Sequence, residues 1–545
     1  MAERRAAEPE APTGADAQYE TVGKATDALY AISYPVHNDI MPRYKDSNQE
    51  QGRFLSINLG DQLLPDTFEY TMNYLINEEI DLSELDSKYK NDLTGAPAYD
   101  PRVLLKIILY AYSRGIFSSR RIMELCETNV VAKALSGDSV PHFTVIADFI
   151  TSMREEISGI FLKVLMICQD MELIGGKLFA IDGCKLPSNA SKESSGTFGD
   201  LKRRKEKMQR TVKLLIGKHT AMDKQESVAG SDESVRRKKS IQKLKAKIRR
   251  IKSFLGSEEP KQGSRGKEVQ SNITDNQSAK MKSSRGMIQG YNGIALADEK
   301  ASVIIASEAY GTGAEQETFK PVIEQAEKNL KAVTDKKEPL CAKTILADAG
   351  YFSEENLRGA AEKKLEAIIP DVNFRKRDER FVDRKAHAGA DYKFGSHDFS
   401  YEAKTTTYIC PNGKALKHVG RSEYHGVFGD RYQSKASDCK GCPLTDRCFL
   451  RKMSIRGRRT LFISDKDEGS NYSARMIEKM DRPEIRKLYS RRVAIIEPVF
   501  ANITFHKKLN RFTLRGKAKV NVQWKLYCMV HNIGKIANAM AAANA

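Results

Sequence analysis

Lys177-Leu-Phe-Ala-Ile-Asp-Gly183 joins four consecutive apolar residues to a single carboxylate, Asp182. Glycines at 175–176 and Gly183 bound the apolar run, a pattern typical of a short, fully buried strand. An unpaired buried charge costs several kcal/mol, so Asp182 needs a cationic partner. A salt bridge or a helix cap would satisfy an isolated aspartate, and a metal ion would do so as well.

Two further carboxylates follow apolar runs. They favour a metal site over a salt bridge or a helix cap as the interpretation of Asp182. Thr344 to Ala347 leads directly into Asp348, and Ile495-Ile496 leads into Glu497. Two aspartates at strand ends and one late glutamate form a set of oxygen ligands suited to Mg²⁺ or Mn²⁺.

The length and net charge of the chain limit the classes of protein to which it can belong. A chain of 545 residues predicts two to four domains, and its net charge of +19 favours a polyanionic partner over solubility alone. No apolar run approaches the roughly 20 residues that span a bilayer, and the first residues lack the apolar core of a signal peptide. Nine cysteines, an odd number, do not suggest a disulfide framework. We expect a cytoplasmic protein without a membrane partner.

Residues 1–50 are expected to form a disordered tail, and residues 51–175 a helical N-terminal domain. Asp100-Pro101 predicts a helix start, Ser118-Ser119 can cap the next helix, and 143–167 reads as a third. Short helices joined by tight turns permit a DNA-reading helix-turn-helix, but a plain helical bundle fits the pattern equally well.

A basic helical hairpin is predicted within 201–285, with the insertion itself over 201–270. Apolar residues at spacings of three and four indicate a coiled-coil seam (Ile241, Leu244, Ile248, Ile251 and Leu255), and a second row offers its partner (Met208, Val212 and Leu215). This stretch holds 25 Lys and Arg against 9 Asp and Glu. A charge run is often only a solvated face, but this imbalance favours an arm that contacts phosphates, including Arg236, Arg237, Lys238 and Lys239.

Strands are expected near 178–182, 291–297, 302–307 and 344–348, with a helix over 315–331 and a helix cap at Ser353. Strands mixed with helices imply a multidomain α/β protein whose sheet occupies 176–370. Residues 481–545 would add a C-terminal helical part, in which Pro498 should break or kink the helix. Trp524 is expected in the core.

Four cysteines lie in the segment 371–480, whose composition is charged and rich in short β-like pieces. Cys439 and Cys442 form a Cys-x2-Cys knuckle, Cys448 follows closely, and Cys410 lies 29 positions before Cys439. Four thiolates could close a tetrahedral zinc site, while reduced surface thiols remain the alternative.

Six motifs together resemble the bacterial insertion-sequence DDE transposases, in the branch whose catalytic domain carries a cysteine-bearing insertion. They are Phe-Ala-Ile-Asp-Gly-Cys-Lys-Leu (179–186), Asn-Ile-Thr-Asp (272–275), Gly-Tyr-Asn-Gly (290–293), Ala-Asp-Ala-Gly-Tyr (347–351), Asp-Cys-Lys-Gly-Cys-Pro (438–443) and Val-Ala-Ile-Ile-Glu-Pro-Val-Phe (493–500). The resemblance spans roughly 50–540 and implies an RNase H-like catalytic domain with Asp182, Asp348 and Glu497 as its triad.

The resemblance also implies the chemistry. Two Mg²⁺ or Mn²⁺ ions, roughly 3.5 to 4 Å apart, serve phosphodiester cleavage and strand transfer, with Asp182 bridging them. The family motif around the glutamate usually reads Tyr, two residues, Arg, three residues, Glu, six residues, Lys or Arg. Here four residues separate Arg492 from Glu497, and Thr504 occupies the late basic position. Arg491, Arg492, Lys507 and Arg511 are nevertheless expected to contact DNA.

Three functions fit these features: an active transposase, an RNase H-fold nuclease that cuts without joining, and a non-catalytic DNA-binding protein with a zinc module. The intact triad argues against the third, and the two basic segments favour the first. The expected partner is double-stranded DNA, as transposon ends and target, bound by a homodimer in the synaptic complex. Such a protein would associate with the nucleoid when bound to DNA.

Overall fold

The computed structural model describes residues 58–86, 89, 97–223, 232–263, 266–283, 286–381, 394–424, 427–449, 457–464 and 472–544. The chain divides into two compact units, 1–57 and 58–545, and the description below concerns the second. The tail predicted over 1–50 lies outside the described residues. Among the helices that are described, none combines the length and apolar character needed to cross a membrane.

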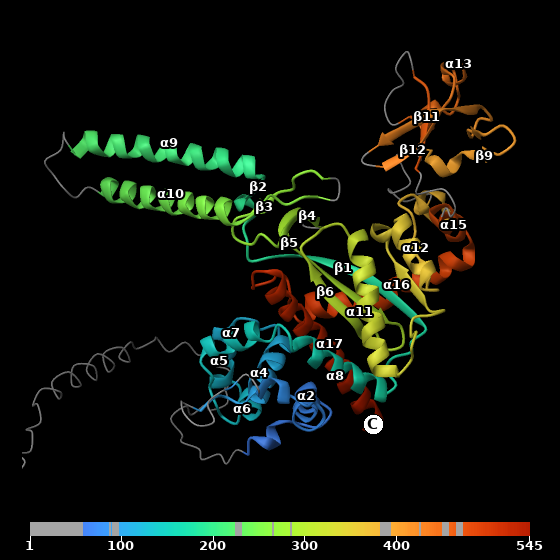
Figure 1. The fold of residues 1–545 in the computed structure, drawn as a ribbon. Helices are drawn as coiled ribbons and strands as arrows, with labels where there is room; N and C mark the ends of the chain where they lie inside the picture. Colours follow the sequence, from blue (N-terminus) through green and yellow to red (C-terminus); the bar gives the residue numbers. More distant parts are fainter. Residues whose placement is uncertain are drawn as a thin grey trace, which may run out of the picture. The chain divides into compact units, whose positions relative to one another are not determined.

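Strand β1 (Leu178–Pro187) lies inside a mixed sheet that has six strands within the described residues (Figure 1). On one edge β1 pairs in antiparallel fashion with β5 (Gly286–Asp298), whose other edge carries β4 (Ala279–Ser283) and β6 (Ile304–Tyr310). On the opposite edge it pairs in parallel with β7 (Thr344–Ala347), followed by β8 (Glu366–Ile368). The four strands expected from the sequence are therefore confirmed.

The strands are buried because helices pack against them. Helix α11 (Gln316–Thr334) packs on β5 and β6 and contacts α12 (Glu354–Glu362), which Ser353 caps as predicted by accepting from the Asn356 N–H. Near the end of the chain, α15 (Tyr472–Met480) precedes α16 (Pro483–Ala501), which packs on β1 and β5. Residues 178–181 are fully covered, which explains why that run is continuously apolar.

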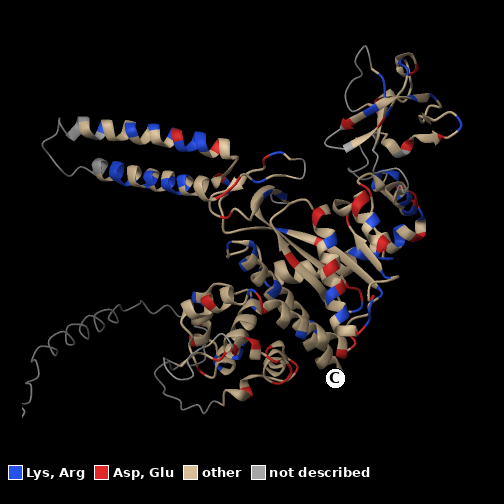
Figure 2. Cartoon of the chain, viewed as in Figure 1, with Lys and Arg blue, Asp and Glu red and all other residues tan. Residues whose placement is uncertain are grey.

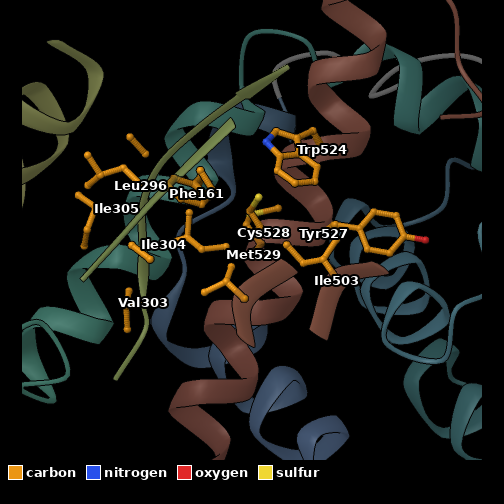
Figure 3. Close-up of a cluster of buried hydrophobic side chains, with 14 of the residues drawn as sticks. Phe161, Leu296, Val303, Ile304, Ile305, Ile503, Trp524, Tyr527, Cys528 and Met529 are labelled. Carbon is orange, nitrogen blue, oxygen red and sulfur yellow. The ribbon is translucent and has the colours of Figure 1, made fainter. Parts of the chain in front are cut away.

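Helix α17 (Lys517–Asn544) contributes many buried side chains to the core. Trp524 is fully buried, donates from Nε1 to the Ile294 carbonyl at 3.0 Å, and lies against Gly293, where a Cβ would come within 3.0 Å of the indole. Figure 3 shows Trp524, Cys528 and Met529 gathered with the side chains of β6. The Asn532 amide accepts from the backbone N–H of Ile304 and donates to its carbonyl, each at 2.9 Å, so one side chain completes a strand's hydrogen bonding.

The N-terminal segment is helical, as expected. Its helices are α2 (Phe68–Tyr74), α3 (Ser83–Asp86), α4 (Pro101–Ser113), α5 (Ser119–Thr128), α6 (Val130–Ser136), α7 (Phe143–Ser152) and α8 (Ile157–Asp170). Asp100 caps α4 by accepting from the Arg102 N–H at 2.7 Å. The single helix predicted over 143–167 is wrong, because turns at 153–156 divide it. Helices α2, α4, α7 and α8 pack on α17, so their buried side chains join those of the sheet in one core.

Helices α9 (Phe198–Asp223) and α10 (Asp232–Ser257) form the predicted hairpin and lie side by side (Figure 1). The short strands β2 (Ser195–Gly196) and β3 (Ser271–Asn272) pair where the hairpin leaves and rejoins the chain. Ile241, Ile251 and Val212 are buried along the predicted seam, and Phe254 adds to it. The turn between the helices lies outside the described residues.

A second, smaller sheet carries the cysteines. It contains β9 (Ser400–Glu402), β10 (Thr407–Ile409), β11 (Ala415–Tyr424), β12 (Val427–Gln433) and β13 (Thr460–Ser464), with short helices α13 (Ala436–Cys439) and α14 (Thr445–Cys448). Phe394, Phe399, Leu416 and Leu461 form its own small core.

The break predicted at Pro498 is wrong. Helix α16 runs through Pro498 to Ala501 and continues as a π-helix over Asn502–His506. The proline removes one backbone donor, but its own carbonyl accepts from the Asn502 N–H, which keeps the last turn helical.

Candidate active site

Asp182 and Asp348 meet at one edge of the sheet. The parallel register pairs Ile181 with Ala347, so the two aspartates follow directly from paired residues, and the prediction that they lie on adjacent strands is confirmed. Asp182 Oδ1 accepts from the Gly183 N–H at 2.7 Å, and Asp348 Oδ1 accepts from the Gly350 N–H at 2.8 Å. Each carboxylate is thus held by its own local backbone.

Arg492 brings a cation to this pair from α16. Its Nη1 donates to Asp182 Oδ2 at 2.6 Å, and the two side chains are only 11% and 20% exposed. The guanidinium also lies 5.9 Å from the centre of the Tyr489 ring. The sequence indicated that Arg492 would face a substrate phosphate, whereas here it contacts the first aspartate.

The two carboxylates are electrostatically coupled. Burial raises the pKa of Asp182, Arg492 and the Gly183 N–H oppose that effect, and the negative charge of Asp348 raises the pKa further. Two carboxylates that repel each other in a partly buried place are stabilised by any cation placed between them. Their hard oxygen donors suit Mg²⁺ or Mn²⁺.

Neither this site nor the cysteine cluster is fully formed for metal in the structure. Across the described ranges, no group of three or more His, Cys, Asp or Glu side chains is spaced to hold an ion. The carboxylate oxygens are donors of the kind that binds Mg²⁺ or Mn²⁺, and the thiols are of the kind that binds Zn²⁺.

Glu497 is not brought together with the aspartates. It is exposed on α16, while Ile495, Ile496 and Val499 are buried against the sheet. Five helical positions separate it from Arg492, which corresponds to about 140° around the helix axis. The helix therefore presents Arg492 to Asp182 and turns Glu497 toward solvent.

The other basic residues expected to bind DNA have partners within the chain. Arg491 forms an ion pair with Glu299. Lys507 Nζ donates to Asn502 Oδ1 at 2.8 Å, and burial lowers the pKa of its ammonium to about 8. Arg511 is exposed and its Nη2 lies 3.4 Å from the Ser188 carbonyl oxygen. Contacts of these side chains with phosphate stay predictions.

The sequence did not single out Glu315. It directly precedes α11 and forms an ion pair with Lys185 of β1 at 2.9 Å. Its carboxylate lies over Gly350, beside Asp348. The one sequence signal was indirect: Gly350 belongs to the motif Ala-Asp-Ala-Gly-Tyr, and a glycine there permits this close approach.

The four cysteines of the small sheet lie close to one another. Burial raises the pKa of the Cys448 thiol, and the neighbouring thiols of Cys439, Cys410 and Cys442 raise it further. Polar hydrogens already point at the sulfurs: the Lys414 N–H donates to Cys410 Sγ at 3.3 Å. Such donors stabilise thiolates that bind a metal.

Positive charge follows both helices of the hairpin (Figure 2). Lys238 and Lys239 are exposed on α10, as is Arg236, while Arg237 is half-buried. Apolar side chains that include Leu201, Ile251 and Phe254 form a cluster of their own along this hairpin.

Two protein-family models match two separate segments of the chain. Residues 57–152 match a transposase domain (DUF772), which covers most of the N-terminal helices. Residues 409–537 match a transposase DDE domain, which covers the cysteine cluster, α16 and much of α17. Both matches are to transposase domains, and together they support an insertion-sequence DDE transposase.

The matched DDE segment contains Glu497, Arg491 and Arg492, while Asp182 and Asp348 lie before it. Their pairing across β1 and β7 is seen in the structure and not in the family match. Neither the search of curated proteins nor the search of solved structures returned a match.

Proposed function

We propose that this transposase binds the ends of its insertion sequence and carries out metal-dependent DNA cleavage and strand transfer. The observation that supports it most is the pairing of Asp182 and Asp348 at adjacent strand ends in a chain with two transposase matches. The sheet order β6-β5-β1-β7-β8, with the first three strands antiparallel and the last three parallel, supports an RNase H-like catalytic domain.

Asp182 and Asp348 would hold Mg²⁺ or Mn²⁺, which supplies an activated water at neutral pH and charge stabilisation on the leaving oxygen. Arg492 keeps the Asp182 carboxylate oriented and retains a positive charge beside the place where a phosphate would lie. Glu497 remains the third carboxylate assigned by the motif, and in this role α16 would have to turn it toward the sheet.

The DNA partner would be held in at least two places. The basic hairpin would contact phosphates without reading bases, since its Lys and Arg residues are numerous and repetitive. The N-terminal helices would recognise the element's ends, and two copies of the chain would form the synaptic complex. The cysteine cluster would bind one structural Zn²⁺ and order its small sheet.

The direct test incubates the full-length protein with a DNA duplex carrying the element's end and either Mg²⁺ or Mn²⁺. Wild type should nick the end and join a pre-cut 3′-hydroxyl end to a plasmid. Asp182→Asn and Asp348→Asn should fold and bind DNA but lose both activities by at least about 10³-fold, as loss of a metal ligand implies. Cleavage without joining would favour the nuclease, and binding without either activity would favour a non-catalytic protein.

Glu497→Gln tests the third carboxylate separately. The amide keeps the shape of the side chain and removes the charge that a metal requires, so cleavage should be lost while DNA binding persists. Glu484→Gln, on the first turn of the same helix, is the matched control and should cleave like wild type. Normal cleavage by Glu497→Gln would remove Glu497 from the triad.

A further inference from the structure

Glu315 shares a confined space with Asp348. A Cβ placed on Gly350 would collide with Glu315 Oε2 and would come within 2.9 Å of Asp348 Oδ1. Both carboxylates therefore lie on the same side of Gly350 and meet there only because residue 350 has no side chain. The Glu315 side chain makes no capping hydrogen bond to α11, so helix capping does not account for its position.

A buried hydroxyl lies among the carboxylates. Tyr351 is fully buried, and its hydroxyl forms no hydrogen bond of normal geometry within the described structure, although Thr318 is near. Burial raises the pKa of Tyr351, and the charges of Asp182, Glu315 and Asp348 each raise it further. Three carboxylates from three separate segments thus lie near enough to the Tyr351 hydroxyl to raise its pKa.

Two side-chain cations neutralise this cluster at its flanks. Arg492 pairs with Asp182 at 2.6 Å, and Lys185 pairs with Glu315 at 2.9 Å. The side chains of Lys185 and Glu315 are 26% and 12% exposed, so this pair lies at the edge of the protein and can separate without unfolding. Both cations occupy positions that a divalent ion would compete for.

We propose that Glu315 is a further carboxylate ligand of the divalent ion bound by Asp182 and Asp348. The inference rests on the proposed function and deepens it, because it adds the residue that precedes α11, which neither family match covers. If Glu315 held the metal, the Lys185 ammonium would lose its ion pair and would be free to contact a substrate phosphate, while Arg492 would keep its contact with Asp182.

Mn²⁺ binding to the full-length protein, measured by electron paramagnetic resonance without DNA, tests this assignment independently of activity. Glu315→Gln should weaken Mn²⁺ binding by at least about tenfold, the scale expected for loss of a group at a metal site. Glu317→Gln is the matched control. Glu317 lies in the first turn of α11, two residues after Glu315, and its carboxylate accepts from the Thr312 hydroxyl at 3.4 Å. It should bind Mn²⁺ like wild type.

Gly350→Ala provides a second variant that leaves every carboxylate in the chain. Its Cβ would displace the Glu315 carboxylate and should weaken Mn²⁺ binding in the same direction. Trp524 fluorescence, reporting on the core far from residue 350 in sequence, checks that both variants remain folded.

Asp182→Asn and Asp348→Asn in the same titration separate the two proposals. If both lose Mn²⁺ binding while Glu315→Gln retains it, Glu315 is only a salt-bridge partner of Lys185 and the inference is wrong. If all three variants bind like wild type, or wild type binds no Mn²⁺, the metal site itself is wrong and the proposed function fails with it.

Discussion

Asp182 illustrates what a residue's sequence surroundings can and cannot predict. A carboxylate at the end of a buried apolar strand had to find a cation, and the structure provides Arg492 at 2.6 Å. The partner could not be predicted because it lies 310 residues away on a helix whose rotation about its axis the sequence leaves open. For the same reason Glu497 was expected beside the aspartates and is exposed instead.

His531 permits a prediction about pH. Its ring is 1% exposed, and its two nitrogens lie 2.9 Å from the Ser302 carbonyl oxygen and 3.0 Å from the Asn502 amide. Burial lowers the pKa of His531 to about 4, and the nearby charges of Lys535 and Lys507 act in the same direction. An unfolded histidine titrates near 6.5, so between the two values the unfolded chain binds the extra proton.

Stability should therefore fall as the pH decreases from about 6.5 to about 4, by up to about 3 kcal/mol from this residue. Urea unfolding of wild type and His531→Gln across this range measures the effect. The glutamine variant is neutral at every pH and should lose the part of the slope that His531 contributes. Parallel pH profiles for the two proteins would show that His531 is not buried as a neutral ring.

At the scale of elements, regular patterns were the most predictable. The hairpin seam at Ile241 and Ile251 and the cap at Ser353 followed from spacing and local chemistry, which depend only on near neighbours. The break between α7 and α8 was missed because 153–156 contains neither proline nor glycine. The helix did not end at Pro498, and α16 continues to Ala501 while it packs on β1.

The hairpin's charge leads to a quantitative prediction. Lys238→Gln with Lys239→Gln should weaken DNA binding equally for all sequences and flatten the dependence of log K on log salt by up to about 1.8, as loss of two phosphate contacts requires. Lys336→Gln with Lys337→Gln removes the same charge from an exposed loop after α11 and serves as control. Equal slopes for the two double variants would assign the hairpin's charge to solubility.

The cysteine cluster leads to a prediction about metal content. Protein purified without chelator should contain about one Zn²⁺ per chain, and Cys442→Ser should lose it and unfold the small sheet, for which the described residues include four buried core side chains. Cys341→Ser, outside this sheet, should retain the ion. Mass spectrometry of the intact protein counts the zinc, and its absence from wild type would contradict the proposal.

Within the described residues, the N-terminal helices and the main sheet share one core, while the small sheet has a core of its own. Sequence composition could mark 51–175 as helical, but it could not show that α17, near the end of the chain, packs on those helices and on β6. Contacts between segments so far apart depend on the assembled fold, and local patterns do not encode them.

Leu105→Ala tests this shared core. Leu105 is fully buried in α4, so the cavity should cost about 2 to 5 kcal/mol. Because α4 packs on α17, the single tryptophan of the chain, Trp524, should report the full loss in fluorescence-monitored unfolding. An unchanged fluorescence midpoint, with a lower midpoint by circular dichroism, would mean that the N-terminal helices unfold independently.

The position of α17 also has a consequence for synthesis. The apolar strand β6 leaves the ribosome well before α17, the helix that packs on it, since α17 begins 207 residues after β6 ends. At typical translation rates this interval lasts roughly 10 to 41 s. Throughout it the nascent chain carries an unprotected hydrophobic surface, so we expect its yield to depend on chaperones and on growth temperature. Arg492 also emerges in the last part of the chain, so a product that ends before residue 492 lacks the cation that pairs with Asp182.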